Sequence, residues 1–302
     1  MKIRANKIDI EVEDSGAEIN PDGTARPVVL LIMGLGMQLI AWPPEMVRSL
    51  VDAGFRVVRF DNRDVGLSQH LDPLGAPNLL WVGLKHRLGC RIQAPYSLQQ
   101  MAADALGVLD ALQIDKAHIV GVSMGGMIAQ RLALLAPARV LSLASIMSSS
   151  GARGLPAARP EVTRLLLSRP ADKSLPAAIE HTFGLFKAIG SPGFPMDDAL
   201  LRERVTAAAE RGFHWPGIVR QMVAILADST RAGALAGVAV PTLVVHGKAD
   251  PLVPLACGED TARRIPGARL AAIEGMGHDL PPGVVERLLE LLIPHFDAAR
   301  VR

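Results

Sequence analysis

The sequence predicts an α/β fold in which a mostly parallel central sheet carries helices on both faces and a helical cap is inserted. Short apolar runs alternate with helical patterns along most of the chain, which is typical of parallel strands joined by crossover helices. Several runs are continuously apolar, as in strands buried on both faces. The alternation stops between residues 148 and 230. We therefore expect a core formed by residues 1–147 and 231–302 and a cap formed by residues 148–230.

The first part of the core is predicted to contain two strands, a helix and a third strand. Residues 7–14 alternate charged and apolar side chains, which indicates a half-exposed strand, whereas the run VVLLIM at residues 28–33 indicates a buried one. A helix is expected at residues 42–54 because two prolines stand near its start and a glycine closes it. Residues 55–61, FRVVRFD, predict the next strand.

The remaining core elements repeat this order. Residues 96–112 predict a helix, because Ser97 and Gln100 match the two positions of a capping box. Before the cap we expect a strand, a helix and a strand, at residues 117–122, 124–136 and 139–147. After the cap we expect a strand, a helix, a strand and a helix, at residues 238–247, 258–267, 268–275 and 283–296.

Composition and charge argue against several classes of protein. The 302 residues include 32 Lys and Arg against 30 Asp and Glu, and no dense basic run is present, so nucleic acid is not an expected partner. Cys90 and Cys257 stand alone, which favours the reducing cytoplasm over a disulfide scaffold or a metal site. The first residues lack the long apolar core of a signal peptide or a membrane span, so no stable membrane association is expected.

A serine stands where a predicted strand gives way to a predicted helix. In the sequence GVSMGG, Ser123 is preceded two residues earlier by Gly121 and followed two residues later by Gly125, which is a G-x-S-x-G pattern. A serine at such a bend adopts a strained backbone, and side chains at the flanking positions would collide. The bend also directs the N–H of Met124 toward the start of the helix, where a negative charge is favoured. The pattern predicts a nucleophilic serine.

An acid and a base follow this serine in the order that a nucleophile elbow requires. Asp250 lies in a turn after the apolar strand that ends at residue 247, and His278 lies in a glycine-rich loop after the next strand. Both positions fall at the carboxyl edge of the sheet, where sites form in open α/β folds. His246 is expected to support the acid loop, and Asp279 adjoins the base too closely to be its partner. Ser123, Asp250 and His278 are therefore predicted to be catalytic.

The loop after the second predicted strand, with the sequence MGLGMQ, is expected to complete the site. Gly34 and Gly36 allow the backbone to turn close to a substrate, which leaves the N–H of Leu35 as a donor. The N–H of Met124 is the other expected donor. Together they predict an oxyanion hole made of main-chain groups.

With these features in order, the sequence resembles the α/β-hydrolase superfamily over nearly its whole length. Many members carry His-Gly at the oxyanion loop, whereas Met33 and Gly34 stand here. This variant, the sequence AWP at residues 41–43 and the sequence DNRDVGLS at residues 61–68 are similar to bacterial esterases typified by the aclacinomycin methyl esterases. Asp61 and Arg63 in the last motif are expected to be structural, as a pair that braces a turn.

The resemblance and the site residues together predict a serine carboxylesterase for small to medium apolar esters, including methyl esters. It would act through an acyl-enzyme on Ser123, without a metal or an organic cofactor. A small-molecule ester is the expected partner, and the protein is expected to be a monomer or a homodimer. Lactonases, C–C bond hydrolases, cofactor-free haloperoxidases and acyltransferases share these residues, and a small-molecule receptor shares the fold, so these alternatives stay open.

Two apolar regions have more than one interpretation. Apolar side chains in the cap segment could line a substrate pocket or pack its core. Residues 77–89, PNLLWVGLKHRLG, could form a flap over the entrance or a packed helix.

Overall fold

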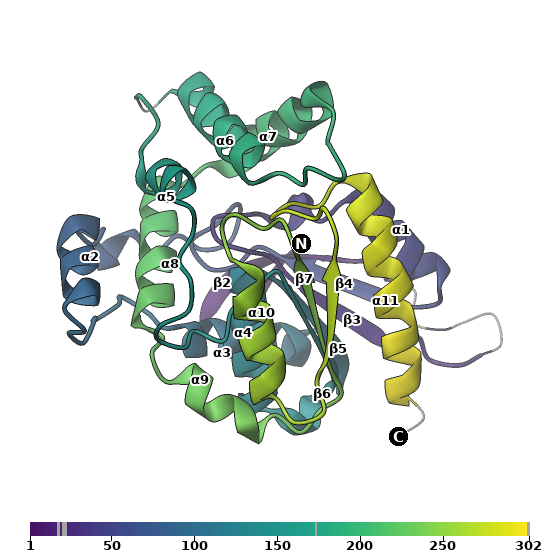
Figure 1. Ribbon diagram of the computed structural model, residues 1–302. Helices are drawn as coiled ribbons and strands as arrows, with labels where there is room; N and C mark the ends of the chain where they lie inside the picture. The colour runs from purple at the N-terminus through teal and green to yellow at the C-terminus, as the bar shows by residue number, and fades with distance from the viewer. Residues whose placement is uncertain (17–18, 20–22, 173, 301–302) are drawn as a thin grey trace.

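Eight strands form one sheet in the computed structural model, which describes residues 1–300 except 17–18, 20–22 and 173 (Figure 1). Their order across the sheet is β1-β2-β4-β3-β5-β6-β7-β8. β2 pairs antiparallel with both β1 and β4, and all other neighbours are parallel. The predicted mostly parallel sheet is thus confirmed. The strands are β1 (Lys2–Ala5), β2 (Ile8–Asp14), β3 (Val28–Ile32), β4 (Arg56–Phe60), β5 (Ala117–Val122), β6 (Val140–Ile146), β7 (Thr242–Gly247) and β8 (Arg269–Ile273).

The N-terminal edge contains one strand more than the sequence predicts. The strand expected at residues 7–14 forms as β2, and β1 precedes it in a hairpin in which Ala5 faces Ile8 across a two-residue turn. Asn6 and Lys7 form this turn with φ of 46° and 69°. Two consecutive residues with positive φ match the twist of a hairpin, and this conformation usually requires glycine. The Asn-Lys pair gives little signal in the sequence, so β1 was not recognised as a separate strand.

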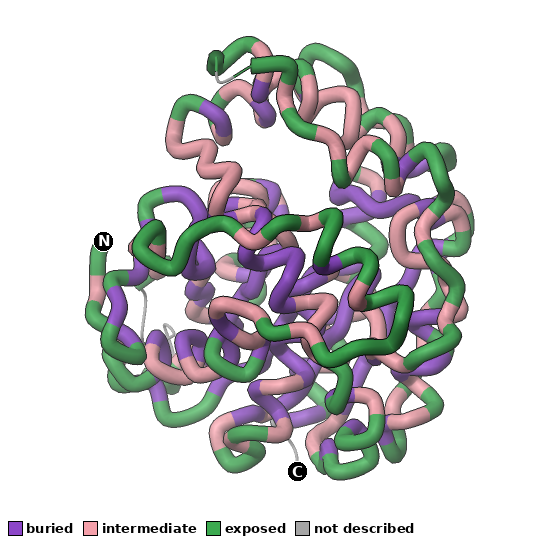
Figure 2. Tube along the Cα trace, turned by 90° about the vertical axis from the view of Figure 1, so that its left-hand side faces the viewer, coloured by how far each residue is buried: buried purple, intermediate pink, exposed green. Residues whose placement is uncertain are grey.

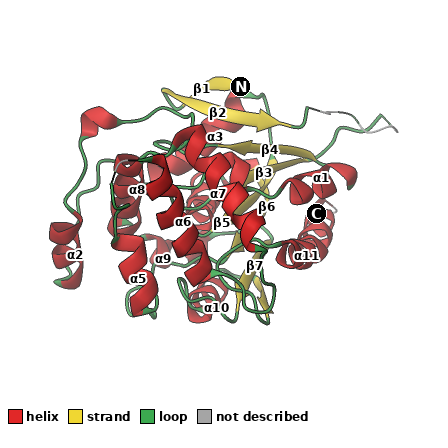
Figure 3. Ribbon diagram, turned by 90° about the horizontal axis from the view of Figure 1, so that it is seen from above, coloured by secondary structure: helices red, strands yellow, loops and turns green. Residues whose placement is uncertain are grey.

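Helices cover both faces of the sheet (Figure 3). In β3, Val29 and Leu31 pack into the same core as helices α1 and α11, whereas Leu30 and Ile32 pack with α3 and α4. Successive side chains of a strand point to opposite faces, which is why this continuously apolar run can be buried on both sides. The helices of the core are α1 (Pro44–Asp52), α3 (Leu98–Ala111), α4 (Met124–Leu135), α10 (Leu255–Arg264) and α11 (Pro282–Arg300).

Between β6 and β7 the chain forms helices and no strand in its described residues. Figure 1 shows α5, α6 and α7 above the sheet, with α8 leading down beside it. Buried residues concentrate in the body of the molecule, whereas these upper helices are mostly half-buried or exposed (Figure 2). The helices are α5 (Pro160–Leu167), α6 (Leu175–Ile189), α7 (Asp198–Gly212), α8 (Trp215–Ala227) and the short α9 (Arg231–Ala234).

A further helix, α2 (Leu79–Arg87), stands away from the sheet beside α8 (Figure 1). Of its nine residues only Val82 is buried. Residues 77–89 are therefore not a packed helix. None of the helices in the described part of the chain combines the length and the hydropathy that a membrane span requires.

Candidate active site

Ser123 lies in the tight turn between β5 and α4. Its φ is 56°, an uncommon conformation for a residue with a side chain. The flanking glycines explain how this turn is possible. A Cβ on Gly121 would lie 2.1 Å from the carbonyl oxygen of Gly125, and a Cβ on Gly125 would lie 2.0 Å from that of Ile32. Only glycine fits at these two positions.

Hydrogen bonds hold the backbone of Ser123 from the neighbouring strand. Its N–H donates to the carbonyl oxygen of Ile146 over 2.9 Å, and its own carbonyl oxygen accepts from Ser148 Oγ over 2.7 Å. Met124 is the first residue of α4, a position whose N–H has no acceptor within its own helix. The start of α4 therefore directs an N–H, and the positive end of the helix dipole, toward the space beside Ser123.

The structure brings His278 and Asp250 together with Ser123, although they follow different strands. The Nε2 atom of His278 lies 3.0 Å from Ser123 Oγ, and its Nδ1 atom lies 2.7 Å from Asp250 Oδ2. The second carboxylate oxygen of Asp250 accepts N–H groups from Leu252 at 2.9 Å and from Val253 at 2.8 Å. Asp250 and His278 are both buried. The acid is thus fixed by its own turn, with one oxygen left for the imidazole.

This arrangement fixes the tautomer of the imidazole. An ionised carboxylate can only accept hydrogen bonds, so Nδ1 of His278 carries the proton that faces Asp250. In the neutral imidazole Nε2 is then an acceptor, and the Ser123 hydroxyl can donate to it. The three side chains therefore form a directed chain of two hydrogen bonds.

Two other titratable side chains lie near these residues and have different partners. His246 Nε2 donates to the carbonyl oxygen of Val253 over 2.7 Å, and burial lowers the pKa of the imidazole. The neutral ring thus supports the turn that carries Asp250. Burial raises the pKa of Asp279 to about 6, even though the Ser191 hydroxyl donates to its carboxylate. Asp279 thus bonds to the segment between α6 and α7.

The loop that contains Leu35 passes directly beside Ser123. A Cβ on Gly34 would lie 3.2 Å from the Cβ of Ser123, so the main chain there approaches the serine closely. Side chains from other parts of the molecule hold this loop at both ends. The Asn62 amide donates to the carbonyl oxygen of Met33 over 2.9 Å, and the N–H of Leu39 donates to Asp61 Oδ1 over 2.7 Å.

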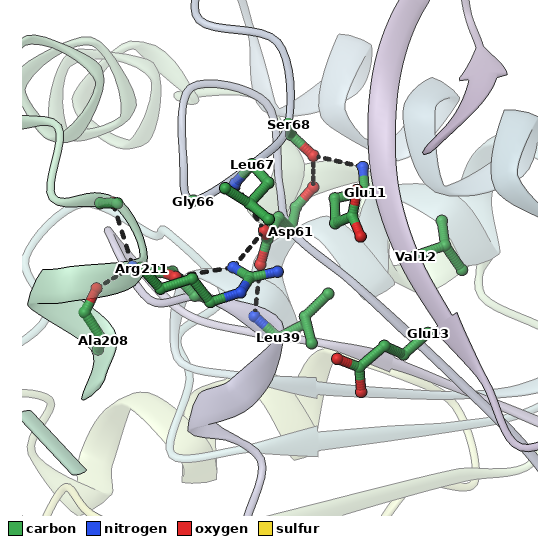
Figure 4. A network of polar contacts seen from close by, with 12 residues as sticks. Glu11, Val12, Glu13, Leu39, Asp61, Gly66, Leu67, Ser68, Ala208 and Arg211 are labelled. Atoms are coloured by element: carbon green, nitrogen blue, oxygen red, sulfur yellow. Dashed lines mark hydrogen bonds and ion pairs between the residues drawn. The ribbon is translucent and has the colours of Figure 1, made fainter. Parts of the chain in front are cut away.

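The expected pair between Asp61 and Arg63 does not form, which corrects the sequence prediction. The carboxylate of Asp61 accepts hydrogen bonds from the N–H groups of Leu39 and Leu67. It also forms an ion pair with Arg211 of α7 at 2.6 Å (Figure 4). Burial raises the pKa of this carboxyl despite those donors. Arg63 instead pairs with the buried Asp104 of α3 at 2.6 Å. Asp61 and Arg63 therefore brace different elements, Asp61 the Leu35 loop and α7, and Arg63 the helix α3.

Helix α8 carries a polar residue that sequence reasoning missed. Gln221 is fully buried, and its side-chain oxygen accepts the N–H of Gly36 over 2.9 Å while its amide donates to the carbonyl oxygen of Arg63 over 2.9 Å. The neighbouring Arg220 forms a buried ion pair with Asp64 at 2.7 Å. The sequence does contain a signal for these contacts, since Arg220 and Gln221 stand among apolar residues in a helical pattern. Buried polar side chains require hydrogen-bond partners, so this pattern indicates contacts with another element.

The loop that carries His278 is also tied to the segment between α6 and α7. The N–H of His278 donates to the carbonyl oxygen of Ile189 over 2.7 Å, and the N–H of Gly277 donates to Ser191 Oγ over 2.8 Å. The residues between β6 and β7 therefore contact both the Leu35 loop and the His278 loop. No feature of the sequence around Ser191 indicated this.

One group of side chains has the spacing of metal ligands. One ligand atom each from His70, Asp72 and His214 lies within 4.8 Å of the others. The Arg220 guanidinium lies 3.1 Å from Asp72 Oδ1, the oxygen that also lies 3.0 Å from His214 Nε2, and a cation at that position competes with a metal ion. The cluster connects the loop after β4 to the start of α8, and we assign it no metal.

Comparisons with known proteins agree with this architecture. The family model described as the alpha/beta hydrolase fold matches residues 27–281. Rhodomycin D methylesterase DnrP of Streptomyces peucetius is 33% identical over 293 residues, which cover 90% of this chain and 92% of the relative. A 2-hydroxy-6-oxononadienedioate/2-hydroxy-6-oxononatrienedioate hydrolase of Cupriavidus pinatubonensis is 28% identical, with 89% of this chain and 88% of the relative covered.

Solved structures share the fold at lower identity. The meta-cleavage product hydrolase CumD of Pseudomonas fluorescens IP01 superposes with a TM-score of 0.73 at 21% identity, over 99% of this chain and 98% of that one. The enol-lactonase of Burkholderia xenovorans LB400 superposes with a TM-score of 0.72 at 20% identity, over 98% and 100%. The resemblance stated for the sequence is confirmed by the family match and the methylesterase relatives. The chain therefore belongs to the α/β-hydrolase family.

Proposed function

We propose that the protein is a serine carboxylesterase that hydrolyses small to medium apolar carboxylic esters, including methyl esters. The observation that carries this proposal is the contact of His278 with both Ser123 Oγ, at 3.0 Å, and Asp250 Oδ2, at 2.7 Å. A hydroxyl, an imidazole and a carboxylate in this order activate a serine for acyl transfer. The rhodomycin D methylesterase relatives support an ester as the bond that is broken.

Each member of the triad has one task in this mechanism. His278 Nε2 accepts the proton of Ser123 as its Oγ attacks the ester carbonyl, and the imidazolium then donates that proton to the leaving alcohol. Asp250 holds the Nδ1 proton throughout and stabilises the positive charge on the ring. Water then attacks the acyl-enzyme, with His278 again as the base, and releases the acid.

The N–H groups of Leu35 and Met124 receive the oxyanion in each tetrahedral intermediate. The placement of Gly34 against Ser123 and of Met124 at the first position of α4 supports this assignment. Such a donor contributes roughly 3–4 kcal/mol of transition-state stabilisation in enzymes where one has been removed. The reaction requires neither a metal nor an organic cofactor.

Residues 148–230 form the cap that selects the substrate in this proposal. Helices α5 to α7 stand above the sheet (Figure 1). Asp250 follows β7 and His278 follows β8, and the N–H of His278 donates to the carbonyl oxygen of Ile189 at the end of α6. Several of the large apolar side chains in the cap are only half-buried, as expected where an apolar substrate contacts them. They are Leu165, Leu166, Phe183, Leu185, Phe186, Phe194 and Trp215.

We place the enzyme in the cytoplasm. Both cysteines are free thiols, with Cys90 exposed and Cys257 buried, which suits a reducing compartment. A monomer or a homodimer remains our prediction for the oligomeric state.

The test is hydrolysis of p-nitrophenyl esters from acetate to long acyl chains. We expect Ser123→Ala and His278→Ala each to lower kcat by roughly 10⁵–10⁶-fold, because removal of one member disables the whole triad. Ser229→Ala and His86→Ala replace the same residue types at positions that make no described contact with the triad, after α8 and in α2, and should keep native rates. The preferred chain length measures the pocket under the cap.

Two results would contradict the proposal. Retained turnover in a folded Ser123→Ala variant removes the nucleophile assignment. A native protein that cleaves a vinylogous C–C bond or a lactone, but none of the acyclic esters, changes the substrate class and leaves the triad in place.

A further inference from the structure

Helix α2 projects from the body of the molecule and is well defined by its own sequence. The side chain of Asn78 caps it by accepting the N–H groups of Leu80 at 3.0 Å and of Trp81 at 3.2 Å. Figures 1 and 3 both show the helix outside the layers of the core, connected by extended loops. Val82 faces the body and is buried. The remaining surface of α2 is available to solvent.

Four large apolar side chains form a stripe along α2 and the residue after it. The exposed fractions are 87% for Leu80, 56% for Trp81, 47% for Leu84 and 67% for Leu88. At about 100° per residue these positions fall within an arc of about 100° on the helix surface. Val82 lies on the opposite side of the helix. Contiguous exposed apolar side chains of this kind mark a surface that binds a membrane or another molecule.

The stripe has basic residues on both of its sides. On the same helical projection Lys85 falls beyond one edge of the stripe, and Arg87 falls beyond the other. Lys85 Nζ also lies 5.5 Å from the centre of the Trp81 ring, and the exposed Arg91 follows the helix. The sequence has no Asp or Glu from residue 73 to residue 103. The whole projection is therefore apolar and cationic, without a compensating acid of its own.

We propose that α2 is a docking surface for anionic lipid. The leucines and Trp81 enter the boundary between headgroups and acyl chains, and Lys85, Arg87 and Arg91 contact the lipid phosphates. An apolar stripe with tryptophan and a cationic border is complementary to such an interface in both polarity and charge. One short helix gives reversible binding, which differs from the stable association that the sequence argues against. The binding does not depend on the chemistry at Ser123.

The test measures co-sedimentation of the full-length protein with phosphatidylcholine vesicles that contain or lack phosphatidylglycerol. We expect binding to the anionic vesicles that weakens as salt is raised. The double variant Lys85→Glu/Arg87→Glu should weaken it roughly 25-fold or more, at about fivefold for each cationic side chain lost. Leu84→Asp should weaken it about tenfold or more. Leu135→Asp alters an exposed leucine at the end of α4 and should bind like the native protein.

Trp81 provides an independent readout at the proposed contact. Its emission should shift to shorter wavelength with anionic vesicles, and Trp81→Phe should lose the shift while it still sediments. Equal binding by the native protein and Leu84→Asp would overturn the proposal, as would equal binding to vesicles with and without phosphatidylglycerol. A native protein that ignores vesicles but self-associates, with Leu84→Asp monomeric, would assign the stripe to a second copy of the chain instead. An unchanged thermal midpoint confirms that each variant is folded.

Discussion

Ser123 lies between two loops that are held in place by different means. The turn into α4 is fixed by main-chain packing, since Gly121 and Gly125 leave no space for a Cβ. The loop that contains Leu35 is fixed by side chains, because Asp61 and Asn62 hold its ends and Gln221 holds the N–H of Gly36. One side of the proposed oxyanion hole is thus local and the other is assembled from distant segments.

The difference matters for how the site responds to change. The α4 side depends only on residues within a few positions of Ser123 and on the adjacent strands. The Leu35 side depends on α8, which belongs to the segment between β6 and β7. A shift of that segment would therefore move the proposed oxyanion donor at Leu35 while Ser123, the proposed nucleophile, stays in place. Substitutions on the two sides should separate folding effects from catalytic effects.

The largest effect on activity and stability is expected from a substitution in the turn between β5 and α4. A Cβ at residue 125 would lie 2.0 Å from the carbonyl oxygen of Ile32, and backbone cannot give way as a flexible side chain can. Gly125→Ala should therefore abolish ester hydrolysis and lower the free energy of unfolding by more than about 3 kcal/mol, as severe overpacking does. Urea denaturation and p-nitrophenyl ester assays measure the two effects.

Gly184 provides the matched control for that substitution. It lies within α6, where an added Cβ would meet no other described side chain or neighbouring element within 4 Å. Gly184→Ala should therefore be neutral or stabilise the protein by up to about 1 kcal/mol. A folded, active Gly125→Ala variant would show that side chains, and not main-chain packing, hold both loops.

The fold was largely predictable because its signals are local. Continuous apolar runs mark β3 and β5, and the capping box at Ser97 and Gln100 forms as expected. The hairpin at Asn6 and Lys7 was missed because a turn with positive φ at both residues can form without glycine when the strands pair well. Helix α2 was ambiguous since its apolar residues lie on two sides.

The contacts within the candidate site were predictable only where the residue types and their spacing in the sequence indicate them. Glycine spacing indicates the bend at Ser123, and the order of acid and base along the chain selects Asp250 and His278 among the other candidates. The partners of Asp61 and Arg63 could not be predicted, because Arg211 and Asp104 are distant in sequence and only the packing of α7 and α3 brings them near. Gln221 was missed for the same reason.

An intermediate effect on activity and stability is expected from a substitution that releases the loop containing Leu35. Gln221→Leu removes the acceptor for the Gly36 N–H and the donor for the Arg63 carbonyl, so buried groups lose their partners at a cost of roughly 1–3 kcal/mol in stability. Because Leu35 precedes Gly36 directly, we expect kcat for p-nitrophenyl esters to fall roughly 10–100-fold with a smaller change in KM.

Gln130→Leu is the control that separates a displaced Leu35 loop from a general loss of protein stability. Gln130 is also fully buried, and from the middle of α4 its side chain bonds to Ser145 of β6 and to Arg231, with no described bond to the Leu35 loop. The two variants should lose similar stability, but only Gln221→Leu should lose kcat. Equal kcat in both would mean that the Leu35 loop keeps its conformation without α8.

The smallest effect is expected at Asp279, which joins the His278 loop to Ser191. Its pKa is raised by burial to about 6, so the native state holds the proton more tightly than the unfolded chain does. Because the pKa is higher in the folded state, the free energy of unfolding falls as the pH increases from about 4 through 6. The total loss is about 3 kcal/mol for a shift of two pKa units. Asp279→Asn removes the ionisation and should be more stable than the native protein by about 1–3 kcal/mol at pH 7.5.

That advantage should shrink to about half at pH 5 and vanish near pH 4, where the carboxyl of the unfolded chain is also protonated. Urea titrations at these pH values test the sign, and the surface substitution Asp115→Asn controls for the change of side chain. Lower stability of Asp279→Asn at pH 7.5 would mean that hydrogen bonds from Ser191 to the ionised carboxylate outweigh its burial. The His278 loop would then be held by a charged side chain, and the contrast with the main-chain packing around Ser123 would be sharper still.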